Sequence, residues 1–260
     1  TDGGPGAIPA QRYGYHPMGI TAEKLAGIYG LTRRQQDEFA MNSQVKMAQA
    51  IQSGRFREQI VPVTVGEGDA RRVFEVDEHP FLSSMEKLGA LKPAFKKDGS
   101  VTAGNSSGRN DGASAVLMMS EEKMMALGYR PMAKVIGVGS SGCDPTVMGL
   151  GPVESSRLAM SRAGVSIHDL DVIELNEAFA AQSLAVIEEW KKLGIEEAQL
   201  LAKINPNGGA IAHGHPLGCT GCALTVKCMY ELHRRPEARY GLITLCCAGG
   251  LGVAVVIEKC

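Results

Sequence analysis

The chain has 260 residues and a formal net charge of −1, with 44% hydrophobic and 21% charged residues. These proportions are those of an ordinary globular protein, and they exclude collagen, coiled coil and intrinsic disorder. The near-neutral charge gives no field for nucleic acid or an anionic membrane, and no apolar run approaches the roughly 18 residues of a membrane span.

The first hundred residues are predicted to be helices and loops. The N-terminus, TDGGPGAIPA, has neither an initiator Met nor a signal pattern, so we expect a processed product or a start partway through a gene. Thr32 and Gln35 fit a capping box, which predicts a helix that begins there and stops at Gly54. The charge-rich residues 67–77 are predicted to be a solvated excursion.

Strands and helices alternate in the second half of the chain. Before them, residues 102–108 are small and flexible, and residues 113–119 are predicted to be a buried strand or helix. Strands are predicted at 133–138, 172–175, 242–246 and 253–257. Helices are predicted at 152–163, 179–193 and 219–233, with a Gly-rich loop at 205–218. This order predicts a mixed sheet covered by helices, the α/β class.

The cysteine content indicates a reducing compartment. Seven cysteines, an odd number, do not resemble the disulfide framework of a secreted domain. We therefore expect an intracellular protein of the cytoplasm, with the mitochondrion and the peroxisome as alternatives.

Three polar clusters interrupt the apolar elements at strand ends or in loops, where α/β folds place their sites. They begin at Asn176, at Asn207 and at Cys246. Each has an ordinary structural explanation: a helix cap, loop histidines bonded to backbone, or small buried thiols. Together, however, a Cys, a His and an Asn can supply a thiolate, a base and an oxyanion donor.

A metal site is the competing interpretation of the second cluster. His213, His215, Cys219 and Cys222 form an H-x-H-x3-C-x2-C run, and a Cys-x-x-Cys pair is typical of zinc or redox sites. Both cysteines, however, fall in the first turn of a predicted amphipathic helix rather than in a knuckle. We therefore predict no metal.

At these residues the chain resembles the thiolases, the acyltransferases that make or cleave 3-ketoacyl-CoA. The likeness rests on residues 175–180 (LNEAFA), 207–216 (NGGAIAHGHP) and 246–252 (CCAGGLG), with 18–23 (MGITAE) and 103–108 (AGNSSG) upstream. The resemblance covers the C-terminal two-thirds of the family's pattern. It implies a layered thiolase-like fold in three parts: a mostly helical, CoA-cradling loop domain (1–101), the closing segment of the N-terminal domain (102–130) and the C-terminal domain (131–260).

The resemblance also implies roles for individual residues. Cys246 matches the acid/base Cys, and His215 the residue that activates the nucleophile and helps to hold the thioester oxygen. Asn176 matches the Asn that fixes a water near the same oxygen, and Ala248 stands where relatives commonly have a Gly whose N–H serves an oxyanion hole. An acid/base Cys of this kind is expected to have a pKa drawn toward neutrality. The residues that match positions along the CoA path are Met18, Ala103, Ser107, Ala178 and Phe179.

Several family features are absent or altered. Phe81 and Leu82 follow Pro80 where many members carry an Arg for the CoA phosphates, so other basic residues are candidates for that contact. These are Lys92, Lys96, Lys97, Arg55 and Arg57. His213 is an extra imidazole to which the resemblance gives no role.

The family's nucleophilic Cys has no counterpart here, since Cys143 lacks its surrounding pattern. We therefore expect a complementary N-terminal segment, as a separate chain or as residues outside this sequence. The implied function is an acyl-CoA C-acetyltransferase, with CoA as a substrate, no further cofactor, and a homo-oligomer (dimer or tetramer) as its assembly. The alternative is a thiolase-like module that binds acyl-CoA or assembles with a partner without catalysis.

Overall fold

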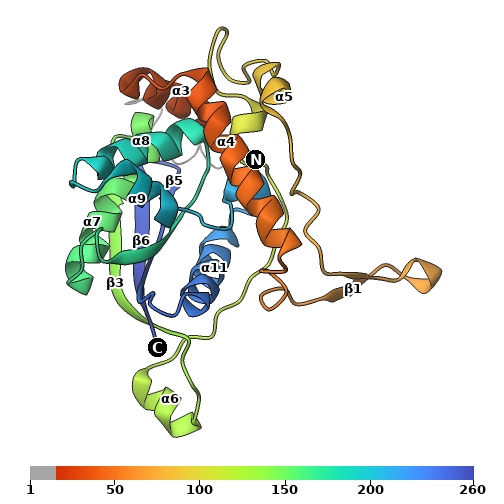
Figure 1. Ribbon diagram of the computed structural model, residues 1–260, viewed down its shortest axis with the longest axis vertical. Helices are drawn as coiled ribbons and strands as arrows, with labels where there is room; N and C mark the ends of the chain where they lie inside the picture. The colour runs from red at the N-terminus through yellow and green to blue at the C-terminus, as the bar shows by residue number, and fades with distance from the viewer. Residues whose placement is uncertain (1–15) are drawn as a thin grey trace.

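A four-stranded mixed sheet forms the centre of the molecule. The computed structural model describes residues 16–260. Its central strands are β3 (Ala133–Gly142), β4 (Leu170–Leu175), β5 (Tyr240–Cys247) and β6 (Leu251–Lys259), and they lie in the order β3-β6-β5-β4 (Figure 1). Only β4 and β5 are parallel. The predicted α/β class and its four strands are confirmed.

Helices cover both faces of this sheet. Alternate residues of β4 point to opposite faces, so Ile173 packs beside Trp190 on one side and Val172 beside Leu224 on the other. The first face is covered by α7 (Gly151–Ala163), α8 (Ala180–Lys191) and α9 (Glu197–Lys203), and the second by α11 (Thr220–Arg234). Each fully buried Leu, Ile or Val contributes roughly 1.5–3 kcal/mol, so these two layers hold the sheet in place.

The first part of the chain packs against one end of these layers. It contains α3 (Met18–Tyr29), α4 (Arg33–Gln52), α5 (Met85–Gly89) and the 3-10 turn η2 (Ala103–Asn105). The predicted helix over 32–54 is confirmed, and the Thr32 capping box is present with both of its hydrogen bonds. None of the helices in residues 16–260 is long and apolar enough to cross a membrane.

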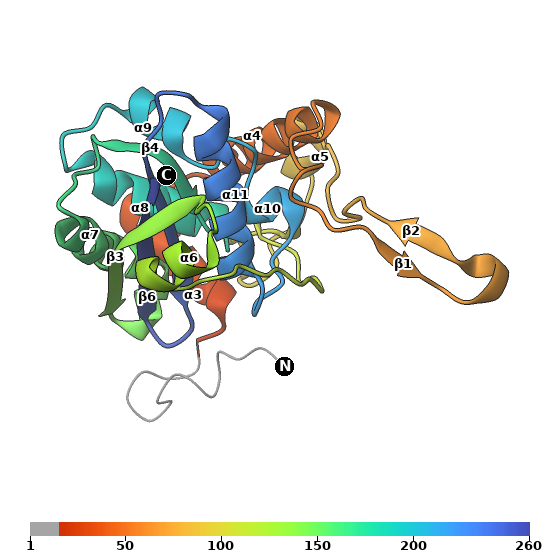
Figure 2. The same ribbon diagram turned by 90° about the horizontal axis from the view of Figure 1, so that it is seen from below.

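The charge-rich stretch is a hairpin that stands away from the body of the protein (Figure 2). It consists of β1 (Val63–Val65), the turn η1 (Gly68–Ala70) and β2 (Arg72–Phe74). Apart from Phe74, residues 67–77 are exposed, as predicted for a solvated excursion.

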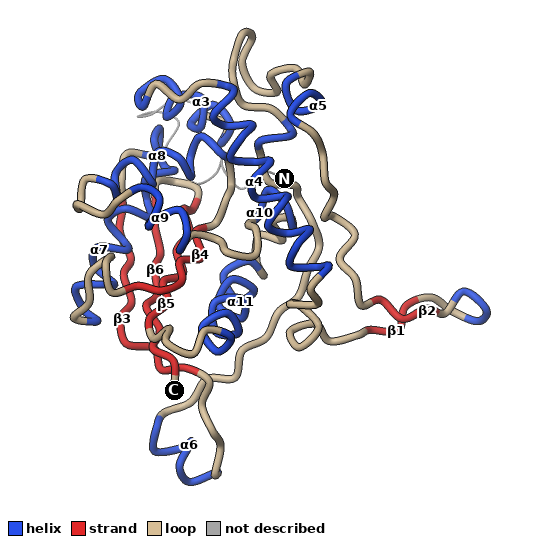
Figure 3. The backbone as a smooth tube through the Cα atoms, in the orientation of Figure 1, coloured by secondary structure: helices blue, strands red, loops and turns tan. Residues whose placement is uncertain are grey.

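Other segments differ from the prediction. Residues 113–119 form neither a strand nor a helix, and the chain that leads into α6 (Glu121–Leu127) is loop (Figure 3). Leu117 is 76% exposed and Met118 71%. An apolar run becomes a buried element only where another surface covers it, and nothing in residues 16–260 covers this one. The helices α6, α9 and α10 (Ala210–His213) and the turn η3 (Pro145–Leu150) were not predicted.

Candidate active site

Two of the predicted clusters meet at one edge of the sheet because their strands are parallel neighbours. Leu175 of β4 pairs with Thr244 of β5, and the N–H of Asn176 donates to the Thr244 carbonyl at 3.0 Å. Asn176 therefore follows the carboxyl end of one strand, while Cys246 lies two residues beyond Thr244 on the next. The register brings the amide and the thiol to the same edge.

The Gly-rich loop carries the third residue to this edge. Nε2 of His215 lies 3.4 Å from Nδ2 of Asn176, and Nδ1 lies 2.7 Å from the hydroxyl oxygen of Thr220. The Thr220 hydroxyl donates to the Pro216 carbonyl, so its oxygen accepts a hydrogen bond from Nδ1–H of His215. This network leaves Nε2 as the unprotonated, basic nitrogen. Burial lowers the pKa of His215, which keeps the imidazole neutral at pH 7.

Cys246 differs from expectation in its acidity. The sequence predicts a pKa drawn toward neutrality, but burial, together with the neighbouring Cys247 and Cys143, raises the pKa of the Cys246 thiol to about 12. Removal from water penalises the thiolate, and the stabilising contacts it has are weaker than this penalty. The prediction was wrong in direction: at rest, Cys246 is a protonated thiol.

Ala248 lies in the turn between β5 and β6. Among the non-glycine residues that the structure describes, only Asp98 and Asn205 have a positive φ. Ala248 therefore has an ordinary backbone conformation, and an Ala can occupy this position without strain. Its N–H lies in this turn, two residues after Cys246.

Three of the five residues predicted to line the CoA path, Ser107, Ala178 and Phe179, lie at one extended segment, residues 106–110. Ser107 donates from both its N–H and its hydroxyl to the Ala178 carbonyl, at 3.0 and 3.2 Å. Ser106 forms a bridge with Phe179. At the other end of the segment, the His215 N–H donates to the Gly108 carbonyl at 3.0 Å. The segment thus joins these three residues to the imidazole.

Met18 and Ala103 lie farther along this side of the molecule. Met18 begins α3, and its neighbour Gly19 lies against the Phe95 ring so closely that a Cβ would meet that ring at 2.2 Å. The Phe95 ring in turn stands edge-on to Phe179, with 5.9 Å between centroids. Ala103 is exposed in η2. The structure thus brings Met18, Phe179, Ala178 and Ser107 into one region and leaves Ala103 at its margin.

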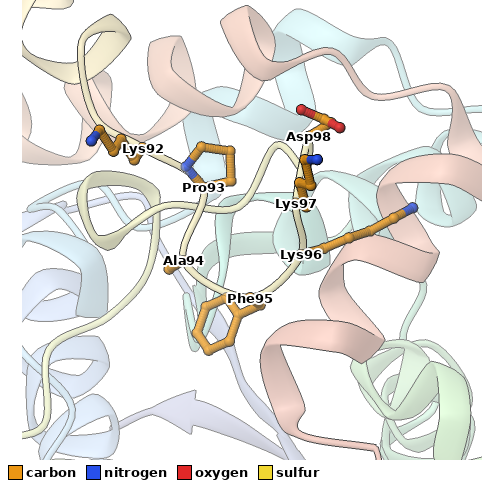
Figure 4. Close-up of a pocket in the computed structure, with 7 residues that line it drawn as sticks. All are labelled: Lys92, Pro93, Ala94, Phe95, Lys96, Lys97 and Asp98. Carbon is orange, nitrogen blue, oxygen red and sulfur yellow. The ribbon is translucent and has the colours of Figure 1, made fainter.

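A shallow hollow of about 460 Å³ opens beside Phe95. Residues 92–98 line it, and Figure 4 shows Lys92, Lys96 and Lys97 among its side chains. Of the other basic candidates, Arg55 is already paired with Glu231 at 3.3 Å. Three of the five basic candidates therefore lie at this hollow, together with the Asp98 carboxylate.

The H-x-H-x3-C-x2-C run does not form a metal cluster. In residues 16–260, no group of three or more His, Cys, Asp and Glu side chains could hold a metal ion. Cys219 caps α11 and Cys222 lies in its first turn, as the sequence predicts. Nε2 of His213 is buried and has no hydrogen-bond partner among the residues that the structure describes, and burial together with the Lys227 charge holds the pKa of this imidazole well below its usual value.

Sequence reasoning missed the residues that support the site. Thr220 and Asn110 both bond to His215, the latter through its Oδ1 and the His215 N–H at 3.2 Å. Glu177, Ser43 and Asn205 form a buried cluster under the loop. Only Glu177 carried a signal, as a charged residue shortly after a predicted strand and shortly before a predicted helix.

Comparison with known proteins gives consistent results over nearly the whole chain. The family model described as "Thiolase, C-terminal domain" matches residues 129–259, and "Thiolase, N-terminal domain" matches residues 8–122. The acetyl-CoA acetyltransferase of Syntrophomonas wolfei is 52% identical over 247 residues, which are 94% of this chain and 60% of that protein. The acetyl-CoA acetyltransferase of Escherichia coli is 49% identical over 95% of this chain and 61% of its own length.

Solved structures of thiolases also resemble this chain closely in fold. The acetyl-CoA acetyltransferase of Bacillus anthracis superimposes with a TM-score of 0.89 at 45% identity, over 95% of this chain and 61% of that one. Human mitochondrial 3-ketoacyl-CoA thiolase in complex with CoA gives a TM-score of 0.84 at 36% identity, over 98% and 61%. This chain therefore spans about three fifths of the length of the relatives it matches.

Proposed function

Since this chain belongs to the thiolase family, we propose that it is the CoA-binding and proton-transferring part of an acetyl-CoA acetyltransferase. The enzyme cleaves 3-ketoacyl-CoA with CoA, or condenses acetyl-CoA units, through an acyl-cysteine. The observation that carries the proposal is the 3.4 Å contact between Asn176 and His215 at the strand edge where Cys246 lies near the end of the neighbouring strand. The names of the curated relatives and the CoA complex of a similar structure support it.

His215 serves the nucleophile in this mechanism. Its unprotonated Nε2 takes the proton of the attacking thiol, while the Thr220 hydroxyl holds Nδ1–H in place. Once protonated, Nε2–H donates to the thioester oxygen as negative charge develops there. The Asn176 Oδ1 is buried without a partner among the described residues, which suits an acceptor for a bound water.

Cys246 moves the proton on the α-carbon. In cleavage the bond between the acyl carbon and the α-carbon breaks, the acyl group stays on the nucleophile, and the electron pair remains as an enolate. The Cys246 thiol gives its proton to that α-carbon. A pKa of about 12 suits this step, since the thiol is protonated at rest and its thiolate, once formed, is a strong base for the reverse condensation.

We further propose that the acyl-carrying cysteine comes from a segment outside these 260 residues, in the same polypeptide or in a partner chain. Burial is the main cause that raises the thiol pKa at five of the seven cysteines, so none of these five is a ready thiolate. They are Cys143, Cys219, Cys228, Cys246 and Cys247. The chain's three-fifths share of its relatives leaves room for such a segment. The assembly we propose is a dimer or tetramer of the complete enzyme.

The CoA phosphates are proposed to lie at the hollow beside Phe95. Lys92, Lys96 and Lys97 supply positive charge there, and the Phe95–Phe179 contact leads from it toward the site. The pantetheine arm then follows residues 106–110 to His215.

Turnover of acetoacetyl-CoA by the complete enzyme tests the proposal. Cys246→Ala is expected to lower kcat at least 1,000-fold, because no other group delivers the α-carbon proton. Cys247→Ala, the adjacent thiol, is the matched control and keeps kcat near the wild-type value. Near-normal turnover of Cys246→Ala would contradict the assigned role. Binding of CoA without any turnover by the complete enzyme would favour the binding module instead.

A further inference from the structure

Beneath the site lies a buried carboxylate that the mechanism above does not use. Glu177 is 2% exposed and accepts hydrogen bonds on both oxygens. The Ser43 hydroxyl of α4 donates to Oε2 at 2.7 Å, the Asn205 side chain to Oε1 at 2.7 Å, and the Ile211 N–H to Oε2 at 3.2 Å. All three contacts are donors, so an acceptor-only carboxylate satisfies them all.

The Gly-rich loop is pressed against this carboxylate. A Cβ at Gly209 would lie 2.1 Å from Cδ of Glu177, and a Cβ at Gly208, whose φ is +76°, would lie 2.6 Å from the Ser43 carbonyl oxygen. The Gly209 N–H also donates to the Ser43 hydroxyl oxygen at 2.9 Å. Glu177 and Ser43 thus hold the loop backbone directly, at a position where only glycine fits.

The charged groups that face Glu177 come from three elements. Lys46 lies on α4, Glu174 on β4 and Lys227 on α11. The Lys227 ammonium donates to the Gly208 carbonyl at 2.7 Å and lies 3.0 Å from a Glu174 oxygen. Burial raises the pKa of Glu177, and Lys227 and the hydrogen-bond donors oppose that rise. Two carboxyl groups and two amino groups therefore lie close together under the loop.

Glu177 links the two parts of the site, Asn176 and the loop that carries His215. The first link is along the chain and the second is a hydrogen bond. Asn176 precedes Glu177 in the chain, and Ile211, which donates to it, begins the short path through α10 and Gly214 to His215. Asn205 bonds to Glu177 and also to both backbone groups of Leu175. The carboxylate thus lies where the strand that ends at Asn176 and the loop that carries His215 are joined.

We propose that Glu177 is a positioning residue, which locks the His215 loop onto the end of β4 and so sets the contact between His215 and Asn176. This inference rests on the proposed function only for its kinetic consequence. The positioning role itself depends only on contacts within these 260 residues.

The main test compares Glu177→Gln with Asp171→Asn. In Glu177→Gln an amide N–H₂ replaces one oxygen and must face a donor, so the loop shifts. Asp171 lies near the start of β4, the strand that ends just before Glu177, and its side chain also accepts from backbone, from the N–H groups of Arg239 and Tyr240. Asp171→Asn is therefore a matched structural control that leaves the site untouched.

In the complete enzyme, Glu177→Gln is expected to lower kcat by about 30- to 100-fold, the scale of an ångström-level misplacement of a catalytic group. KM for CoA stays within about twofold, because Lys92, Lys96 and Lys97 are not displaced. Asp171→Asn changes neither constant beyond about twofold. A rise in KM with kcat unchanged would overturn the inference.

A second readout needs no activity. In NMR titrations of the 260-residue chain, with the His215 signal assigned by its loss in His215→Gln, the wild-type midpoint lies below the ordinary 6.5. In Glu177→Gln it moves up toward that value as the ring leaves its buried position, while in Asp171→Asn it stays. An unchanged His215 midpoint in Glu177→Gln would overturn the inference, even if the proposed function holds. If the complete enzyme instead proves inactive, the proposed function fails and this titration still decides the positioning role.

Ser43→Ala covers the case in which Glu177→Gln does not fold. It removes one donor to the carboxylate and the acceptor of the Gly209 N–H. The His215 midpoint is expected to move in the same direction by a smaller amount, and a wild-type titration in this variant would count against the proposal.

Discussion

At the scale of single residues, burial decides which protonation state each group of the site holds. Cys246, with a thiol pKa of about 12, has a thiolate fraction of about 10⁻⁴ at pH 8, against roughly a quarter for an ordinary cysteine. Iodoacetamide at pH 8 is therefore expected to modify the exposed Cys260 long before Cys246, as mass spectrometry of timed samples would show. Equal rates at the two thiols would mean that Cys246 is activated.

Because of the lowered pKa of His213, we expect the protein to lose stability in acid. The His213 pKa in the folded state is held well below 6.5, whereas the unfolded chain binds the proton at the ordinary value. As the pH falls below about 6.5, the unfolded state takes up protons first, so the free energy of unfolding falls by at most about 1.4 kcal/mol per pH unit for this group.

Urea unfolding at pH 7.5 and pH 5.5 measures that loss. His213→Gln is expected to weaken the pH dependence, while His168→Gln, at an exposed position, leaves it unchanged. The same pH dependence in His213→Gln as in the wild type would refute the assignment.

At the scale of elements, β3 and α7 pack in direct backbone contact. A Cβ at Gly139 of β3 would lie 2.0 Å from the Ser155 carbonyl oxygen of α7. Gly139→Ala is therefore expected to destabilise the protein by about 1–3 kcal/mol in urea unfolding, since the helix must move away. Gly27→Ala in α3 is the matched comparison. It has open space around its added methyl and is expected to stabilise by up to about 1 kcal/mol. Equal effects of the two substitutions would argue against the close β3–α7 contact.

At the scale of the whole molecule, the hairpin is a part that the core hardly supports. Two strands of three residues are marginal alone, and this pair stands clear of the other elements (Figure 2). Limited trypsin digestion is expected to make its first cut within residues 16–260 at Arg71 or Arg72, with the sheet still folded. Gln substitutions at both positions should remove this cut. A first cut within α7 or α11 would contradict this picture of a stable core.

The local sequence pattern was sufficient to predict much of the fold. The helix that begins after Thr32 was predictable because its cap and its stop lie within the segment itself. The strands β4, β5 and β6 were predictable because each is a short apolar run that turn residues delimit. Residues 113–119 had the same kind of pattern and were predicted wrongly, because burial depends on what covers a run and not on the run alone.

By itself, the sequence determined the fold class, the family resemblance and the identity of Asn176, His215 and Cys246 as candidates, since each depends on residues that are close together in the chain. The tertiary structure alone decided how these residues are held and charged. Ser43 and Glu177 are 134 positions apart, and their hydrogen bond exists only because α4 packs over the end of β4. The raised pKa of Cys246 likewise follows from removal of its thiol from water. Both are properties of distant groups brought together, and no pattern within a short segment encodes them.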